Sequence, residues 1–403
     1  MNSEDSIGLI ELDSTNLKCL IFKINKDNNS EILSVTTTPS DGFQNDVVTN
    51  LKKASDSIRL AISTAEKKAK VSLKKINVIF EQPDFLCTRF SKHKKIDDSK
   101  IHRSDIEFLL NEAKKQLTLN DKNQSIIHIF NHNYIVDGKI FIEEPINVFA
   151  DTLTHEMTFI TAPKNNLRNI NQIFLNCDME IERLISQTFA LGVELFSESE
   201  LRSGVVLVHL GSKKTSLGLF KNLALVHSIT FPIGSDHITN DISKVCSLSL
   251  EESLAIRNNI NFSFENNHDL FDENNILKKS FFIESKFRKV SRDLICKIVK
   301  ARTDEILEMI KKQLKLNGFS FNSGMSFFLI GEGSNFINIQ EYCQNFFELN
   351  TNIGRKNDFQ KNFSACQGGI KIIKEGWETE AIPEMKIKSI EKVGFLRKIF
   401  GDF

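Results

Sequence analysis

Apolar segments separated by polar turns open the chain and predict an α/β unit. Two short apolar runs flank the polar residues 13–16, a pattern typical of two strands around a turn. A later stretch has apolar residues at helical spacing within an otherwise polar run. We predict strands over 7–12, 17–22, 32–38 and 76–80, and a helix over 45–70.

The pattern changes over residues 84–161, which predict a compact α+β insert of the size of a small domain. Residues 91–100 carry charges of both signs and are predicted to form a solvated loop. We predict a helix over 106–117 and strands over 125–130, 134–136, 139–142 and 156–161.

The strand, turn, strand pattern returns after the insert. A second hairpin is predicted around the polar turn 211–214, and the Asn-rich residues 259–275 predict a surface loop. We predict strands over 180–184, 205–209, 215–220, 224–229 and 327–330, and helices over 165–177, 186–195, 238–245, 250–258, 285–316 and 363–374. Two α/β halves that each open with a hairpin could form a cleft between them.

Composition and charge exclude several classes of protein. Lys and Arg together number 52, as do Asp and Glu, and this zero net charge argues against an ordinary basic nucleic-acid binder. The seven cysteines form no C-x-x-C pair, so we expect neither a disulfide framework nor a zinc site. No stretch approaches the apolar length of a spanning helix, and we expect a reduced, cytoplasmic chain without a signal peptide.

Four short motifs, in order along the chain, resemble FtsA, the actin-like family of bacterial cell division. The most specific is P-I-G-S-D-H-I-T-N-D-I over 232–242, which is close to the family run P-[VI]-G-G-x-H-I-T-x-D-I-A. Residues 105–138 resemble the inserted subdomain of that family. F-L-I-G-E-G-S over 328–334 resembles its adenosine motif, and G-F-L-R-K-I-F over 394–400 resembles its membrane-targeting tail.

This resemblance implies an α/β, actin-like (RNase H-like) fold of duplicated domains, with an inserted α+β subdomain and a C-terminal amphipathic helix. The implied parts are subdomain IA over 6–83 and 162–201, IC over 84–161, IIA over 202–235 and 318–376, IIB over 236–317, a linker over 377–388 and the amphipathic helix over 389–403. The alternative for residues 363–376 is that they return to subdomain IA instead of belonging to IIA.

The family binds ATP and Mg²⁺ in its cleft, where glycine-rich turns wrap the phosphates. The first family turn reads D-I-G-T-S-K, and the matching residues here begin with Glu11. Its glycine is replaced by Asp13, which puts a negative charge where phosphate would lie, and Ser14 and Thr15 complete the turn.

The second family turn reads D-I-G-G-G-T. Its Mg²⁺-organising aspartate is replaced by His209, a poor ligand for a cation that prefers oxygen. Gly211 remains, whereas Ser212 and Lys213 replace glycines, and Lys213 and Lys214 could still attract an anion.

The adenosine turn is retained in part. Its pattern is kept by Gly331, Gly333 and Ser334. On a nearby helix, Leu254 replaces the ribose-binding glutamate of the family, whereas Arg257 keeps the basic side chain that follows it. We therefore expect a degenerate nucleotide cleft with no catalytic residue, no metal ligand set and no ATP hydrolysis. The alternative is nucleotide binding with altered chemistry.

The last residues form a basic amphipathic pattern. At 100° per residue, one arc collects Val393, Leu396, Ile399, Phe400 and Phe403. Arg397 and Lys398 lie beside this arc, and Lys392 falls within it and would have to snorkel. This pattern fits insertion into an anionic membrane surface. The alternative is a helix docked on the chain's own core or on a partner.

Arg302 and Glu305 match a helix of subdomain IIB, where the family binds the acidic and apolar C-terminal peptide of FtsZ. The alternative is an arginine paired on its own helix with Asp304 or Glu305. His128 and His132 have no third ligand at metal-site spacing, so we expect surface or core histidines.

The function that the resemblance implies is an FtsA-like adaptor that tethers FtsZ filaments to the inner face of the cell membrane at the division site. Its partners would be FtsZ, anionic lipid, other divisome proteins and further copies of itself in filaments or dimers. One alternative is an ATP-binding, polymerising actin-like ATPase. Another is a PilM-like adaptor of a pilus or secretion system.

The tail gives a first prediction. Phe400→Glu places a charge on the apolar arc, so we expect it to release the protein from anionic vesicles. Co-sedimentation with vesicles measures this, and an unchanged bound fraction would count against membrane insertion.

Overall fold

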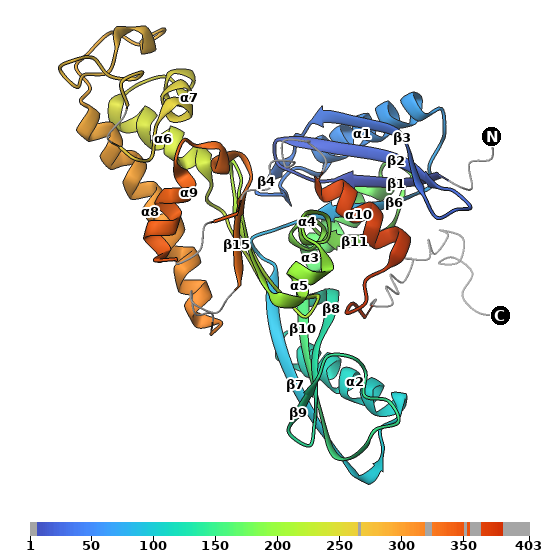
Figure 1. Ribbon diagram of the computed structural model, residues 1–403. Coiled ribbons are helices and arrows are strands. Elements are labelled where there is room, and N and C mark those ends of the chain that lie inside the picture. The colour runs from blue at the N-terminus through green and yellow to red at the C-terminus, as the bar shows by residue number, and fades with distance from the viewer. Residues whose placement is uncertain (1–5, 265–266, 319–324, 350–352, 355–363, 382–403) are drawn as a thin grey trace.

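The structure is a computed structural model that describes residues 6–264, 267–318, 325–349, 353–354 and 364–381. Figure 1 shows three lobes, with the two chain halves side by side and the inserted subdomain projecting away from their junction. The fold is α/β and actin-like, as the sequence predicts, with the inserted subdomain between two parts of the first lobe.

The first lobe is built on a five-stranded sheet in the order β11-β6-β1-β2-β3. The predicted hairpin is confirmed as an antiparallel pair of β1 and β2, and β6 lies parallel to β1. Its strands are β1 (Ser6–Glu11), β2 (Asn16–Ile24), β3 (Ser30–Pro39), β6 (Lys75–Phe80) and β11 (Glu180–Ser186). After β3, the short strands β4 (Phe43–Gln44) and β5 (Val47–Val48) form a separate two-stranded sheet.

Helices cover both faces of this sheet. α1 (Leu51–Ala69) and α3 (Lys164–Leu175) pack together, while α4 (Gln187–Leu195) and α10 (Ser364–Glu375) pack together and contact β6. The prediction that α1 begins at residue 45 was wrong. The side chain of Asn50 accepts a hydrogen bond from the Lys53 amide and caps the helix there, because a helix start needs a partner for its free N–H groups.

The second lobe repeats this arrangement. β12 (Val205–Leu210) pairs antiparallel with β13 (Thr215–Lys221) and parallel with β15 (Ser326–Ile330), and β14 (Ala224–Phe231) lies on the far side of β13. The same hairpin-plus-parallel-strand unit therefore occurs twice. Its helices are α5 (Glu198–Ser203), α6 (Ser235–Cys246), α7 (Leu250–Asn259), α8 (Arg292–Leu316) and α9 (Ile339–Phe347).

Two sequence predictions in this lobe were wrong. α8 begins at Arg292 rather than at 285, because the Ser291 side chain caps it by accepting from the Leu294 amide. Residues 259–275 are not only a surface loop, since Phe262 and Leu270 are buried in the core. The sequence did not reveal this burial, because the few apolar residues of the stretch stand among many asparagines.

The inserted subdomain is a four-stranded sheet in the order β7-β10-β8-β9. Residues 91–100 are not a loop: they belong to the long strand β7, which pairs antiparallel with β10 and buries Phe90 and Ile96. Its charged side chains are partly buried at Lys92 and Lys94 and exposed at Lys95, Asp97, Asp98 and Lys100, and such charges are typical of an edge strand. The elements are β7 (Leu86–Lys100), α2 (Arg103–Asn120), β8 (Gln124–Val136), β9 (Lys139–Phe141) and β10 (Phe149–Pro163).

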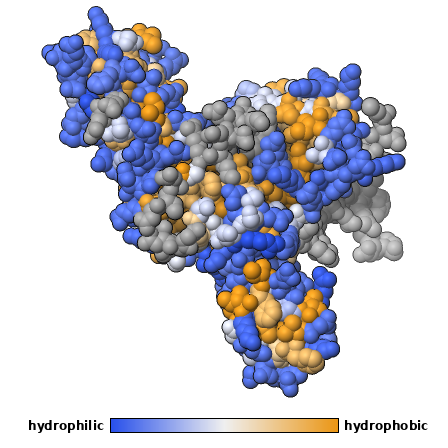
Figure 2. All heavy atoms as spheres, in the orientation of Figure 1, coloured by the Kyte–Doolittle hydropathy of each residue, from blue (hydrophilic) through white to orange (hydrophobic). Residues whose placement is uncertain are grey.

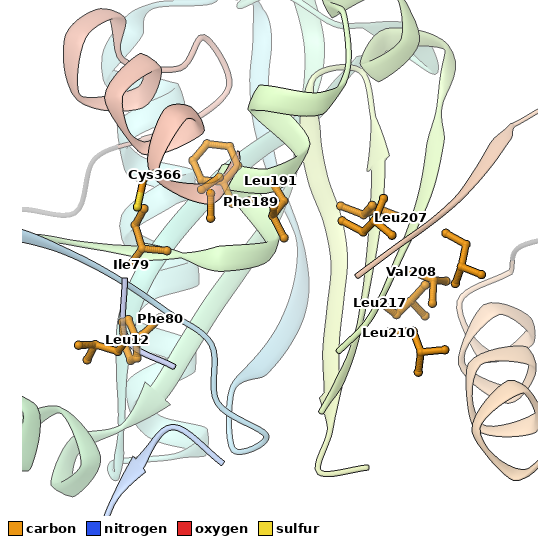
Figure 3. Close-up of a cluster of buried hydrophobic side chains, with 14 of the residues drawn as sticks. Leu12, Ile79, Phe80, Phe189, Leu191, Leu207, Val208, Leu210, Leu217 and Cys366 are labelled. Carbon is orange, nitrogen blue, oxygen red and sulfur yellow. The ribbon is translucent and has the colours of Figure 1, made fainter. Parts of the chain in front are cut away.

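The hydrophobic core runs from the first lobe into the second. Figure 3 shows Leu12, Phe80 and Phe189 on one side and Leu207 and Leu217 on the other. The two lobes meet where α4 packs against β13, and the contact is so close that a Cβ on Gly192 would lie 2.2 Å from the ring of Phe220. A larger residue at Gly192 would therefore force the lobes apart.

Three histidines lie in the sheets where the inserted subdomain meets β14. His132 is on β8, His155 on β10 and His227 on β14, and each has a ring nitrogen without a hydrogen-bond partner among the described residues. Burial lowers the pKa of each ring to about 4. These rings are therefore neutral in the folded protein at pH 7.

We expect the free energy of unfolding to decrease as the pH falls from about 6.5 to about 4, because the unfolded chain takes up protons that the folded chain refuses. His227→Asn should reduce this dependence by about 1.4 kcal/mol per pH unit. Urea unfolding at several pH values measures both slopes. Equal slopes in the variant and the unaltered protein would show that His227 titrates normally.

Candidate nucleotide cleft

The first turn of the cleft joins β1 to β2. Asp13 accepts hydrogen bonds from the amide of Thr15, at 2.8 Å, and from its hydroxyl, so the turn is held by its own side chain. The hydroxyl of Ser14 donates to Asp46 at 2.7 Å, and the Asp46 amide donates back to that hydroxyl at 2.6 Å. The groups of this turn are therefore engaged within the first lobe.

The second turn joins β12 to β13 and lies against the start of α6. Gly211 donates to the carbonyl of Lys214 at 3.0 Å. The amides of Ser235 and Asp236 donate to the carbonyls of Gly211 and Ser212, so the first amides of α6 are used by the turn. A Cβ on Gly234 would lie 2.5 Å from both carbonyl oxygens, and only glycine allows this approach.

Lys214 crosses from the second lobe into the first. Its ammonium group forms an ion pair with Asp46 and donates to the carbonyl of Glu81 at 3.0 Å. Both side chains of the pair are about 95 % buried, with 5 % and 2 % exposed. Gln82 donates to the carbonyl of Asp46 at 2.7 Å, which fixes the acceptor. The sequence-predicted Lys213 reaches only the carbonyl of Ser14, at 3.4 Å.

The pKa values of the cleft follow from this crossing. Burial alone would lower the pKa of Lys214, but the carboxylates of Asp46 and Asp13 raise it above its ordinary value. Burial would raise the pKa of Asp13, and Lys214 together with the Thr15 hydrogen bonds lowers it instead. Burial, with a contribution from Lys214, lowers the pKa of His209 to about 3, so this ring is neutral.

Glu11 lies at the end of β1, 2 % exposed, where the family has an acidic Mg²⁺-site residue. Gln187 donates to one carboxylate oxygen at 2.6 Å, and Lys18 lies 3.2 Å from the other. The thiol of Cys366 on α10 also donates to that second oxygen, at 3.7 Å. The carboxylate is therefore satisfied by protein groups from three elements.

The adenosine turn is brought to the second turn. Ser212 donates to Glu332 at 2.6 Å, and Ser334 donates to the carbonyl of Gly331 at 2.7 Å. Gly331 has a φ of 92°, and a Cβ there would lie 2.5 Å from the carbonyl oxygen of Leu210. Gly333 packs against the side chain of Leu210. The structure thus brings the three predicted turns together, the first and second through Lys213 and Ser14 and the second and third through Ser212 and Glu332.

Sequence reasoning missed Asp46, Glu81 and Gln187. Asp46 fell within the segment predicted as helix, yet it has a left-handed φ of 62° and is 1 % exposed. An N-D dipeptide before a helix cap was the available signal for a turn.

The predicted partner residues lie on α8. Arg302 donates to Asp241 of α6 at 2.6 Å and to Glu305 at 2.5 Å. This guanidinium is about a quarter exposed, and it is paired in the way that the helix-surface alternative predicts with Glu305. The predicted tail, 389–403, lies outside the described residues. In the part of the chain that the structure describes, no helix is long and apolar enough to cross a membrane.

Comparisons with known proteins give the class and then the family. The PilM–PilN type IV pilus biogenesis complex contains a chain with a TM-score of 0.57 and 10 % identity, which covers 92 % of this chain and 97 % of its own. This likeness shows the fold alone. MreB5 of Spiroplasma citri bound to AMPPNP gives a TM-score of 0.48 and 13 % identity, and its nucleotide is a property of that protein. The fold is actin-like.

Two family descriptions match the sequence itself. "Cell division protein FtsA" matches residues 206–368, and "SHS2 domain inserted in FTSA" matches residues 86–161, together more than half of the chain. Cell division protein FtsA of Agrobacterium fabrum is 23 % identical over 87 % of this chain and 81 % of its own. That of Bacillus subtilis is 23 % identical over 96 % of this chain and 87 % of its own. The chain belongs to the FtsA family of cell division proteins.

The cleft gives a prediction about stability. Lys214→Ala leaves the Asp46 carboxylate buried without its cation, so we expect a loss of about 3–5 kcal/mol in the free energy of unfolding. Lys213→Ala is the matched control and should cost less than about 1 kcal/mol, because it loses one long hydrogen bond. Replacing both partners, by Lys214→Met with Asp46→Leu, should recover most of the loss.

Chemical denaturation of the four proteins measures these values. Equal small losses for Lys214→Ala and Lys213→Ala would show that the buried pair does not hold the lobes together.

Proposed function

We propose that this FtsA-family protein is an adaptor that tethers FtsZ filaments to the membrane, with a nucleotide cleft that neither binds nor hydrolyses ATP. The single observation that carries the second part is Lys214, which spans the cleft between the two turns and pairs with Asp46. An internal cation therefore lies between the two turns that, by the family resemblance, would wrap phosphate.

The residues of the cleft do not fit Mg-ATP. Mg²⁺ needs oxygen ligands in octahedral geometry, whereas Glu11 and Asp46 already accept from lysines and His209 offers nitrogen. The negative charge of Asp13 opposes phosphate, and the amides at the start of α6 are used by the second turn. Binding would therefore have to break a buried ion pair and several buried hydrogen bonds.

The partner-binding part of the proposal uses two surfaces. Arg302 is exposed enough to exchange its bond with Asp241 for a carboxylate of an FtsZ C-terminal peptide. Figure 2 shows apolar residues gathered on the inserted subdomain, whose exposed apolar side chains include Phe108, Ile140 and Phe149. Exposed apolar clusters of this kind are typical of partner contacts, here with other divisome proteins or a second copy in a filament or dimer.

The membrane contact is assigned to residues 389–403, whose sequence is basic and amphipathic. The protein would then work on the inner face of the membrane at the division site. Because the proposed cleft is bridged from within, tethering should not depend on nucleotide.

The test is co-sedimentation of a fluorescent FtsZ C-terminal peptide with vesicles that contain phosphatidylglycerol. We expect the peptide to pellet only when the protein is present, and equally with and without Mg-ATP. Arg302→Ala should weaken peptide recruitment about tenfold or more, since it removes charge-assisted hydrogen bonds. Arg168→Ala, an exposed arginine on α3, is the matched control and should change nothing.

Two outcomes would contradict the proposal. Vesicle-bound protein that recruits no peptide would refute the FtsZ tether. Recruitment that requires Mg-ATP would refute the nucleotide-independent cleft and leave the tether standing.

A further inference from the structure

Residues 377–381, which we call the strap, follow α10 and enter the junction of the three lobes. The indole N–H of Trp377 donates to the carbonyl of Leu223 at 2.6 Å, and the hydroxyl of Thr379 donates to the same carbonyl at 3.0 Å. Leu223 lies between β13 and β14, so these bonds join the strap to the second lobe. These five residues are the first part of the linker predicted over 377–388, and the rest of it lies outside the described residues.

The strap also extends the sheet of the inserted subdomain. The Asn131 amide donates to the carbonyl of Thr379 at 2.7 Å, and the Ala381 amide donates to the carbonyl of Ile129 at 2.9 Å. Glu380 thereby pairs antiparallel with Phe130 of β8. β9 covers β8 only at residues 134–136, which leaves this edge of residues 129–131 for the strap. The segment binds as a short added strand does in peptide recognition.

The side chain of Glu380 joins the inserted subdomain to the first lobe. This carboxylate is 1 % exposed, lies 2.6 Å from Nδ1 of His128 on β8, and accepts from Arg183 of β11 at 2.5 Å. The Ser186 amide donates to Nε2 of His128 at 2.9 Å, so the ring proton is on Nδ1 and points at the carboxylate. The two basic groups come from different lobes and meet on one acid.

Other polar bonds cross this junction among the described residues, one of them from the Thr158 hydroxyl to the carbonyl of Val226 at 3.5 Å. Arg89 of β7 donates to the carbonyl of Val226 at 3.0 Å, and Asn222 donates to Asn133 at 2.8 Å. Both join the inserted subdomain to the second lobe. The strap contacts all three lobes. Its buried charge makes its removal costly, because His128 and Arg183 would lose their shared acceptor.

We propose that the strap holds the inserted subdomain in one orientation relative to the two lobes, with Glu380 as the residue that fixes it. The orientation of the inserted subdomain then depends on a segment directly before the C-terminal tail. This inference does not rest on the proposed function, because it uses only contacts among the three lobes.

The test is hydrogen–deuterium exchange of the full chain, with Glu380→Ala compared with Glu378→Ala. Glu378 pairs with Arg202 at the surface, at 3.0 Å, and is the matched control. We expect Glu380→Ala to speed exchange about tenfold or more in peptides that cover residues 124–136, 183–186 and 222–228, while β1, β2, β12 and β13 keep the protection of the unaltered protein. Glu378→Ala should exchange as the unaltered protein does.

Small-angle X-ray scattering of the same proteins measures the overall dimensions, which depend on how the inserted subdomain projects from the other two lobes. We expect a larger radius of gyration for Glu380→Ala alone. Unchanged exchange and an unchanged radius in Glu380→Ala would overturn the proposal. If that variant unfolds, Trp377→Phe removes the indole N–H that donates to Leu223 while it keeps an aromatic ring. Protection at 222–228 equal to that of the unaltered protein would overturn the proposal too.

Discussion

The buried ion pair between Lys214 and Asp46 joins the two halves of the chain at the place where an actin-like fold usually opens to nucleotide. A lysine this deeply buried stays charged only beside a carboxylate, and Asp46, Ser14, Gln82 and the carbonyl of Glu81 are arranged to satisfy the pair. Removing one partner would leave a bare charge in the interior. The contact between the two lobes at this point is thus made by the protein's own side chains.

Two further joints lie behind this pair. At the first, α4 packs on β13 with the Phe220 ring against Gly192, which leaves no room for the lobes to slide. At the second, Glu380 gathers His128 and Arg183 where the inserted subdomain meets the first lobe. These three contacts support the proposed adaptor, which does not need to open and close around a nucleotide.

Local pattern predicted much of this fold. Both hairpins followed from apolar runs on each side of a polar turn, and the buried face of α1 followed from its helical spacing. The strand β7 was not predicted, because the run K-H-K-K-I-D-D is typical of a charged loop and its strand conformation depends on pairing with β10. The helix α9 was not predicted, although Ile339, Cys343 and Phe347 have helical spacing, because the segment is short.

The sequence predicted which turns belong to the site and their order along the chain, but it did not predict which residues pair with them. The altered turn residues were found from the family resemblance, but the partner of Lys214 lies 168 positions away, within a segment predicted as helix. Glu380 and His128 are 252 positions apart. Pairings over such distances depend on the packed fold rather than on neighbouring residues.

The central claim is that protein groups have replaced nucleotide in the cleft. Titration calorimetry of the full chain with Mg-ATP tests it most directly. The account predicts no heat of binding up to millimolar nucleotide, and binding at micromolar concentration would contradict it.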